Sequence, residues 1–333
     1  MSELKTNQIA TNDGNNVAID NSLNLKSYTT TARDALTSAA GDMIYNSTTN
    51  KVQVYTGSAW EDLGGIDALQ IEYLVIAGGG GGNTNDDTAH GSGGAGGYLC
   101  NVNGENSGGN TSAQPSLFIP KSTNLQITVG AGGSSNSAGS KSEFTSIMSV
   151  GGGTPRVGSY NKCGSAGGPN GRTSGGPTAA NTNNIAGQGS ASGQGVSYQG
   201  SGGGGGAGAA GSNGTNNQGG AGGAGLASSI TGSSVTRGGG GGGGGTTGGA
   251  GGSGNNASGT SGTANTGGGG GGSGILTGGT PGSGGSGVVI LRWATADATI
   301  GATRTGLTDG DVQTDGSDSY IVFTAGAGTI TFT

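Results

Sequence analysis

The side chains that could support catalysis are few in this chain of 333 residues. His90 is the only histidine, and acyl transfer by a serine or cysteine needs a histidine beside the nucleophile as its base. His90 ends a polar stretch, residues 83–90, which favours a solvated residue over a catalytic base. The sequence also shows no pair of carboxylates arranged for acid–base chemistry. These residues predict a protein without enzymatic activity.

Motifs for cofactors and metals are equally weak. Matches to Gly-x-Gly-x-x-Gly occur throughout the chain, because its glycine content alone produces them. Gly139–Ser142 reads Gly-Ser-Lys-Ser and lacks the Gly-Lys-Ser/Thr order of a phosphate-binding loop. Asp86 and Asp87 are adjacent, whereas calcium-binding loops place their ligands at alternate positions. We therefore expect no cofactor and no bound metal.

Two cysteines, Cys100 and Cys163, are too few for a disulfide framework. They could form one bridge or remain two reduced thiols packed as small apolar groups, and free thiols are the favoured interpretation.

Charge and hydropathy exclude two classes of partner. The formal charge is −6 and no cluster of Lys and Arg occurs, so we expect no nucleic-acid partner. No apolar run approaches the roughly 18–20 residues that span a bilayer, which predicts a protein that is not membrane-inserted. The N-terminus lacks the apolar segment of a signal peptide, so release from a cell is expected by another route, such as lysis.

One glycine-rich block organises the chain. Of the 85 glycines, 74 fall between residues 78 and 287. Collagen is excluded because glycine does not occupy every third position and only six prolines occur. A disordered linker and a bundle of polyglycine II helices remain. The longest uninterrupted runs are Gly78–Gly82, Gly202–Gly206, Gly238–Gly245 and Gly267–Gly272.

Energetics decide between these two states. Ordering a residue costs about 1–2 kcal/mol, and a backbone hydrogen bond returns about 0.5–1.5 kcal/mol. For isolated glycine runs the entropy cost exceeds the free energy that hydrogen bonds return, so these runs would stay disordered. Runs that stack side by side, with their ends fixed by strands, can be ordered. The ordered bundle is therefore the favoured prediction. The strands expected at its borders are Ile71–Ala77, Leu125–Val129, Phe144–Val150 and Gly287–Trp293.

The two ends of the chain have ordinary composition. Residues 41–65 predict three short strands with aromatic residues, a unit that buries too little surface to stand alone and so favours an oligomer. Brief strands are expected at Val17–Ile19 and Leu23–Leu25, and helix only at Thr31–Ala40. Residues 319–324 and 329–333 read as a terminal hairpin.

Five short segments stand out by their order and spacing: Glu72–Gly78, Gly94–Tyr98, Ile127–Gly133, Ser142–Phe144 and Ser286–Trp293. Together they resemble the glycine-rich domain of bacteriophage tail fibres. Gly41–Leu63 is similar to a module common in phage fibre proteins. In many relatives the counterpart of Tyr320–Thr333 precedes the glycine-rich domain, so we expect a circularly permuted β core in which this hairpin pairs near Ile71–Ile76.

The resemblance implies a fold and a function. The expected fold is mainly β with almost no α-helix, a sandwich-like scaffold of the jelly-roll or TNF-like kind that carries polyglycine II helices. Residues 1–65 would attach and oligomerise as a homotrimer and contact other tail-fibre proteins. Residues 66–293 would form the glycine-rich domain, and residues 294–333 would complete the β core. The expected role is binding of a host surface receptor, an outer-membrane protein or polysaccharide, by a virion tail fibre.

Recognition is expected on loops, because adhesive residues concentrate on loops held by a rigid scaffold. An alternative is that many of the candidate side chains cap the bundle or pack against strands. Two other functions also remain: a non-adhesive virion or filament component in which the bundle is a spacer, and ice binding. The candidates, chosen for apolar, aromatic or cationic reach, are Tyr160, Lys162, Ile185, Tyr198, Leu226, Ile230, Val235, Ile275 and Leu276.

Overall fold

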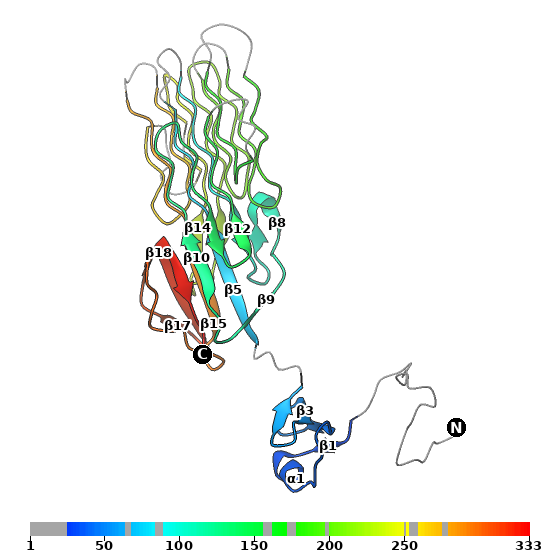
Figure 1. The fold of residues 1–333 in the computed structure, drawn as a ribbon. Helices are drawn as coiled ribbons and strands as arrows, with labels where there is room; N and C mark the ends of the chain where they lie inside the picture. The colour runs from blue at the N-terminus through cyan, green and yellow to red at the C-terminus, as the bar shows by residue number, and fades with distance from the viewer. Residues whose placement is uncertain are drawn as a thin grey trace, which may run out of the picture. The chain divides into compact units, whose positions relative to one another are not determined.

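The computed structural model of the chain contains two compact units, Met1–Ile66 and Asp67–Thr333, which we describe separately (Figure 1). No helix in the described part of the chain is long and apolar enough to cross a membrane. The structure describes residues 25–63, 68–83, 89–155, 162–171, 178–196, 200–249, 251–252, 259–274 and 279–333.

The N-terminal unit is a four-stranded sheet in the order β1-β2-β3-β4. The three strands predicted between residues 41 and 65 are confirmed, and the helix is shorter than predicted. The expected strand at residues 17–19, and all but the last residue of the one at 23–25, lie outside the described residues. The elements are β1 (Ser27–Tyr28), α1 (Thr30–Asp34), β2 (Met43–Asn46), β3 (Lys51–Tyr55) and β4 (Trp60–Asp62).

The interior of this unit is largely polar. Ile44, at 5% exposure, is the one buried hydrophobic side chain among its described residues. Beside it, the buried Asn46 donates from Nδ2 to Gln53 Oε1 at 3.0 Å, and Arg33 Nη1 donates to the same oxygen at 2.8 Å. Meanwhile Met43 and Leu63 are exposed. The unit thus has little apolar core of its own.

A ten-stranded sheet supports the second unit, with the main order β12-β11-β10-β18-β15-β5-β6. Strands β16 and β17 pair with β18, and β9 pairs with β5. The sheet strands are β5 (Ala68–Ile76), β6 (Tyr98–Cys100), β9 (Leu117–Pro120), β10 (Leu125–Val129), β11 (Ser142–Phe144), β12 (Ile147–Ser149), β15 (Val288–Ala294), β16 (Leu307–Asp309), β17 (Gln313–Asp315) and β18 (Asp318–Ile330). The smaller elements are β7 (Asn106–Ser107), η1 (Gly108–Asn110), β8 (Thr111–Ser112), β13 (Leu226–Ser228) and β14 (Val235–Arg237).

Gln188 links the two ends of this sheet. Its side chain accepts from the backbone N–H of Val150, just after β12, at 2.8 Å and donates to the carbonyl of Met148 at 3.0 Å. Its own carbonyl accepts from the N–H of Tyr98, in β6, at 2.9 Å. The sheet is therefore curled, and the side chain and backbone of Gln188 help to join its two terminal strands.

Both faces of the sheet are buried, which explains the nearly continuous apolar run in β5. Alternate residues point to opposite faces of a strand. Leu69, Ile71, Tyr73 and Val75 contribute to a core that includes Phe144, Trp293, Phe323 and Phe332. Leu74 and Ile76 face a second, smaller core with Tyr98, Cys100, Ile230, Val288 and Ile290.

Two sequence predictions for the strands were wrong. Phe144–Val150 is not one strand: it contains the end of β11 and all of β12, separated by a turn in which Thr145 has φ 52°. The C-terminal hairpin is instead the single strand β18, which pairs with β15 through its first half and with β10 through its second. Direct pairing with residues 71–76 does not occur because β15 lies between β18 and β5.

The glycine block forms extended, mutually hydrogen-bonded segments that project from one end of the sheet (Figure 1). In the segment from Gly78 to Asn83, successive N–H groups donate to three different neighbours, and each neighbour is used again three residues later. The donor and acceptor pairs, all between 2.9 and 3.1 Å, are Gly78 to Ser140, Gly81 to Ser137, Gly79 to Gly285, Gly82 to Gly282, Gly80 to Gly94 and Asn83 to Gly91.

The same three-residue period occurs where Ser201, Gly204 and Ala207 donate to Gly244, Gly241 and Gly238. Three residues per turn is the screw of a polyproline II helix, so these segments are polyglycine II helices and the predicted bundle is confirmed. The close approach explains the composition. A Cβ atom on Gly80 would lie 2.2 Å from the carbonyl oxygen of Gly153.

Candidate functional site

The bundle has a sheet end and a far end. Gly238–Gly245 leads away from β14 for eight residues, roughly 25 Å at about 3.1 Å per residue. It ends in a turn at residues 245–248, beside a second turn, Thr215–Gln218. Thr247 joins the two, because it donates to the Asn217 carbonyl at 2.8 Å and accepts from the Gly219 N–H at 2.9 Å.

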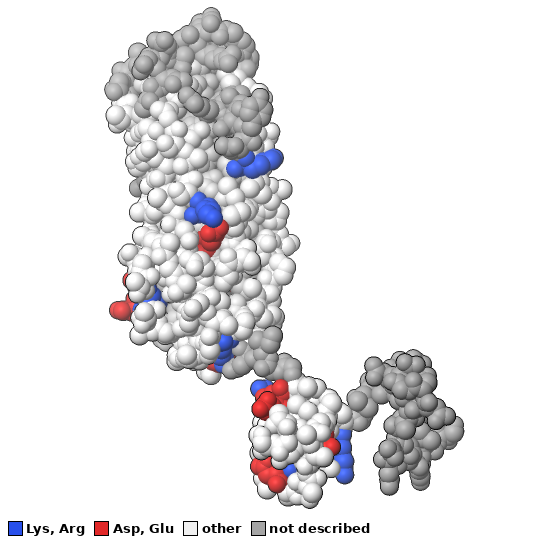
Figure 2. Space-filling view, in the orientation of Figure 1, with Lys and Arg blue, Asp and Glu red and all other residues white. Residues whose placement is uncertain are grey.

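These two turns form a small uncharged surface at the far end, which we call the amide–hydroxyl surface. Its members share exposed side chains that can both donate and accept hydrogen bonds. On the face drawn in Figure 2, most of the described bundle surface is likewise uncharged. None of the residues of the amide–hydroxyl surface was among the predicted contact residues; this surface consists of Thr215, Asn216, Asn217, Gln218, Thr246 and Thr247.

The structure describes five of the nine predicted contact residues. Tyr160, Tyr198, Ile275 and Leu276 lie outside the described residues. The other five do not gather at the far end of the bundle: they are Lys162, Ile185, Leu226, Ile230 and Val235.

Lys162 and Ile185 are brought close together near the sheet. Cys163, which follows Lys162, accepts from the Ile185 N–H at 2.8 Å. The next residue, Gly164, packs against the backbone of Gly97, one residue before β6. Lys162 is exposed and Ile185 is half-buried. This pair therefore belongs to the flank of the bundle beside the sheet.

Leu226, Ile230 and Val235 belong to the hairpin β13–β14, which covers the second core. Ile230 is only 1% exposed and lies in that core, with Leu226 packed against it. Ile230 is therefore a core residue and not the receptor contact predicted from the sequence, because its side chain is inaccessible to a partner. Val235, at 36% exposure, remains accessible.

Glu105 holds the hairpin in place. Its Oε1 accepts from both the N–H and the hydroxyl of Ser229 at 2.7 Å, and Cys100 Sγ donates to Oε2 at 3.4 Å. Burial alone would raise the pKa of Glu105, but the hydrogen bonds from the two hairpin serines outweigh it and lower the pKa. On the other side, Arg292 Nη1 donates to the Ile230 carbonyl at 3.4 Å.

A pH dependence follows from this lowered pKa. The ionised carboxylate stabilises the fold above the ordinary pKa of 4.5, and this stabilisation is lost as the pH falls through the lower folded-state pKa. Urea unfolding of wild type and Glu105→Gln is expected to show a more stable wild type at pH 7 and a shrinking difference below pH 4.5. A difference that stays constant down to pH 3 would contradict this linkage.

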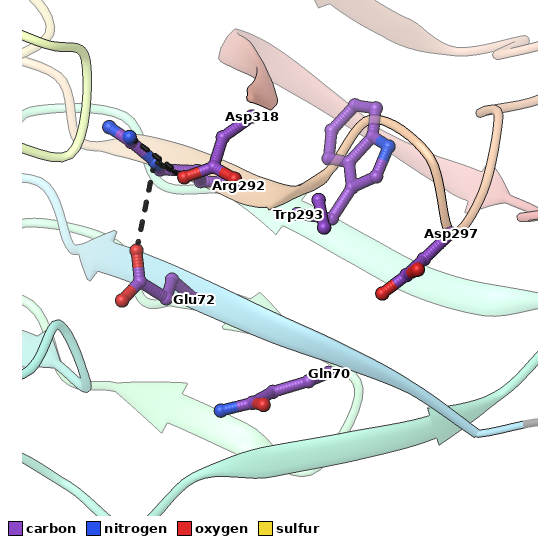
Figure 3. A pocket seen from close by; sticks show the side chains of 7 residues that line it. Gln70, Glu72, Arg292, Trp293, Asp297 and Asp318 are labelled. Carbon is purple, nitrogen blue, oxygen red and sulfur yellow. Dashed lines mark hydrogen bonds and ion pairs between the residues drawn. The ribbon is translucent and has the colours of Figure 1, made fainter. Parts of the chain in front are cut away.

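A pocket of about 230 Å³ lies beside the start of β5, and Figure 3 shows its polar residues. Arg292 contacts the carboxylates of Asp318 at 2.8 Å, Asp315 at 3.0 Å and Glu72 at 3.8 Å. Burial raises the pKa of Glu72, and the nearby Arg292 opposes this. Because its central guanidinium already binds carboxylates, we interpret this cluster as a network that ties β5, β15 and β18 together. The pocket is lined by Gln70, Glu72, Arg292, Trp293, Ala294, Asp297 and Asp318.

The His90 ring is half-buried and hydrogen-bonds to the Ser273 hydroxyl, so it is not the solvated residue that the sequence indicated. Ser273 is 2% exposed, which leaves its hydroxyl inaccessible to a substrate. Among the described residues, no group of three or more His, Cys, Asp or Glu side chains is placed to hold a metal.

The two cysteines are free and buried, which confirms the favoured interpretation. Burial raises the pKa of Cys100 to about 12 and that of Cys163 to about 11. Since the thiolate is the reactive form, iodoacetamide at pH 8 is expected to leave both unmodified in the folded protein and to modify both in urea. Rapid labelling of either thiol without denaturant, measured by intact mass, would contradict the buried placement.

Comparison with known proteins gives one family and no individual relative. No curated protein and no solved structure matches the chain significantly. A family model described as a glycine-rich domain matches residues 48–294, well over half of the chain. This segment includes the last two strands of the N-terminal sheet, the described glycine segments and the sheet strands up to β15. The chain belongs to this glycine-rich domain family.

Proposed function

We propose that the protein is a receptor-binding component of a bacteriophage tail fibre, without enzymatic activity. The observation that carries the proposal is the far end of the polyglycine II bundle. There the amide–hydroxyl surface is held by backbone hydrogen bonds at 2.8 and 2.9 Å rather than by a side-chain core. A rigid scaffold that displays loops is typical of recognition proteins, because the loops can vary without disturbing the fold. The resemblance of several segments to phage fibre domains supplies the biological context.

The chemistry of the far end favours a neutral, hydrogen-bonding receptor. Amides and hydroxyls each donate and accept, and they bring no net charge. A host surface polysaccharide or a polar loop of an outer-membrane protein has matching groups. The N-terminal unit would attach the protein to the fibre as a homotrimer. Its polar interior and its exposed Met43 and Leu63 support association, since a unit with so little apolar core gains stability by burying such residues.

Cell adsorption tests the proposal. Fluorescently labelled full-length protein is expected to bind at least one strain in a panel of Gram-negative bacteria and to block infection of that strain by the phage. Asn216→Ala combined with Thr247→Ala should reduce binding about tenfold or more, because both side chains are exposed at the far end. Met148→Ala, an exposed position on β12 at the sheet end, is the matched control and should bind normally.

Two outcomes would count against the proposal. If no strain binds and infection is not blocked, the adhesive role fails, and a spacer role becomes the better interpretation. Electron microscopy of virions then distinguishes the two roles further. A position of this protein at the fibre tip supports adhesion, whereas a repeating position along the shaft or in a lattice supports a structural component.

A further inference from the structure

The face of hairpin β13–β14 that covers the sheet carries an unusual charge. Leu226 is the direct cross-strand partner of Arg237, so their side chains point to the same face. Leu226 packs against the second core, and Arg237 is therefore directed toward that core as well. Tyr98 lies there too, with its ring atom Cδ2 3.5 Å from the position that a Cβ on Gly238 would take.

Two polar atoms in this place are buried without a hydrogen-bond partner: Arg237 Nη1 and the Tyr98 hydroxyl. Tyr98 is 0% exposed, whereas Arg237 retains partial exposure. No carboxylate of a described residue lies within 4.0 Å of the Arg237 guanidinium. Glu105, the carboxylate on this side of the sheet, is already bound by Ser229 and Cys100.

Burial of these two polar atoms without hydrogen-bond partners destabilises the folded state. A buried donor without a partner loses its hydration without compensation, and the loss is larger for a charged group. Arginine offers only donors, so the missing partner of Nη1 is an acceptor. Burial raises the pKa of Tyr98 well above its ordinary value, which keeps its hydroxyl protonated, so that it too needs an acceptor.

The positive charge of Arg237 and the narrow space around it further restrict the kind of acceptor that fits. An uncompensated guanidinium is best neutralised by a negative ligand, since water satisfies the hydrogen bond but leaves the charge. The surroundings are narrow: a Cβ on Gly238 would approach the Ala207 side chain to 3.0 Å. We propose that Arg237 Nη1 and the Tyr98 hydroxyl together bind a small monovalent anion of the halide class beneath hairpin β13–β14.

Such an ion would connect β14, and the glycine run that follows it, to β6. Arg237 ends β14 where the chain enters its eight-glycine run, and Tyr98 begins β6. The ion would therefore hold the base of the bundle to the sheet from a position independent of the far-end surface. This inference does not rest on the proposed receptor-binding role.

Thermal unfolding in matched salts tests the site. The full-length protein is measured at constant ionic strength while sodium bromide replaces sodium gluconate. The wild-type Tm is expected to rise with bromide and to saturate, because a ligand that binds only the folded state stabilises it by mass action. Tyr98→Phe should weaken the apparent bromide affinity about tenfold through loss of one donor to an anion. Arg237→Met should abolish the effect.

Tyr73→Phe is the matched control, since Tyr73 is an equally buried tyrosine that faces the other core. It should keep the full bromide response. Crystals grown in bromide give a second readout that does not depend on the stability of any variant. An anomalous peak between Arg237 and Tyr98 is the expected result. Density of an ordered water without an anomalous signal, or a bromide response that Arg237→Met retains, would overturn the proposal.

Discussion

Replacing Gly80 by alanine is expected to lower the free energy of unfolding by about 3 kcal/mol or more. The three atoms nearest to the added Cβ all belong to the backbone of Gly152 and Gly153, and the closest is 2.2 Å away. Backbone in a hydrogen-bonded bundle cannot rotate aside as a side chain can, so neighbouring helices must separate. Separation weakens the bonds from Gly80 to Gly94 and from Gly270 to Gly80, both 2.9 Å in the wild type. Urea unfolding followed by circular dichroism measures the change.

Gly310→Ala provides the control for this prediction. Gly310 is exposed, nothing lies within 4 Å of its added Cβ, and its φ is not in the left-handed region. Its substitution should change the free energy of unfolding by no more than about 0.5 kcal/mol. Equal stability of the two variants would mean that the bundle is packed loosely enough to accommodate the added methyl group without losing hydrogen bonds.

Ile230→Ala is expected to cost about 2–5 kcal/mol, the range for removing a large buried aliphatic side chain. Ile230 sits in the second core with Leu74, Ile76, Tyr98 and Ile290 and is 1% exposed. The truncation leaves a cavity beneath hairpin β13–β14, and the anchors Glu105 and Arg292 limit how far the hairpin can collapse into it.

Val235→Ala, on the same hairpin, separates this core role from a role in recognition. Val235 is 36% exposed, and its truncation should cost less than about 1 kcal/mol. The folded fraction of Ile230→Ala is expected to adsorb to cells as the wild type does. Loss of adsorption by well-folded Ile230→Ala, with unchanged stability, would return Ile230 to the receptor contacts.

The main features of the fold followed from composition and short patterns. Alternating or continuous β-branched runs predicted β5, β10 and β15, because a strand buried on one or both faces needs such residues. The glycine runs predicted polyglycine II because only residues without side chains allow backbones to approach closely enough to hydrogen-bond in all directions. β6 and β9 were missed, since three or four residues carry too little periodicity to stand out.

The candidate site was less predictable. Ile230 and Val235 have the same chemical character and lie in the same short hairpin, yet one is core and the other is accessible. Their local sequences do not distinguish them, because the difference in burial arises from where the hairpin packs against the sheet. Gln188 is similar: it joins Val150, Met148 and Tyr98, which are far from it in the chain.

By itself, then, the sequence determined the physical state of the protein: a glycine-rich block that orders as backbone-bonded helices on a β support, with few charges and free thiols. The absence of side chains is the cause, because it lets runs whose ends are fixed by strands approach closely enough to hydrogen-bond through their backbones. The tertiary structure alone decided that β15 separates β18 from β5, that Ile230 is buried, and that Arg237 Nη1 and the Tyr98 hydroxyl are buried without hydrogen-bond partners. These features depend on contacts between distant segments, and only the folded arrangement of strands and helices brings those segments together.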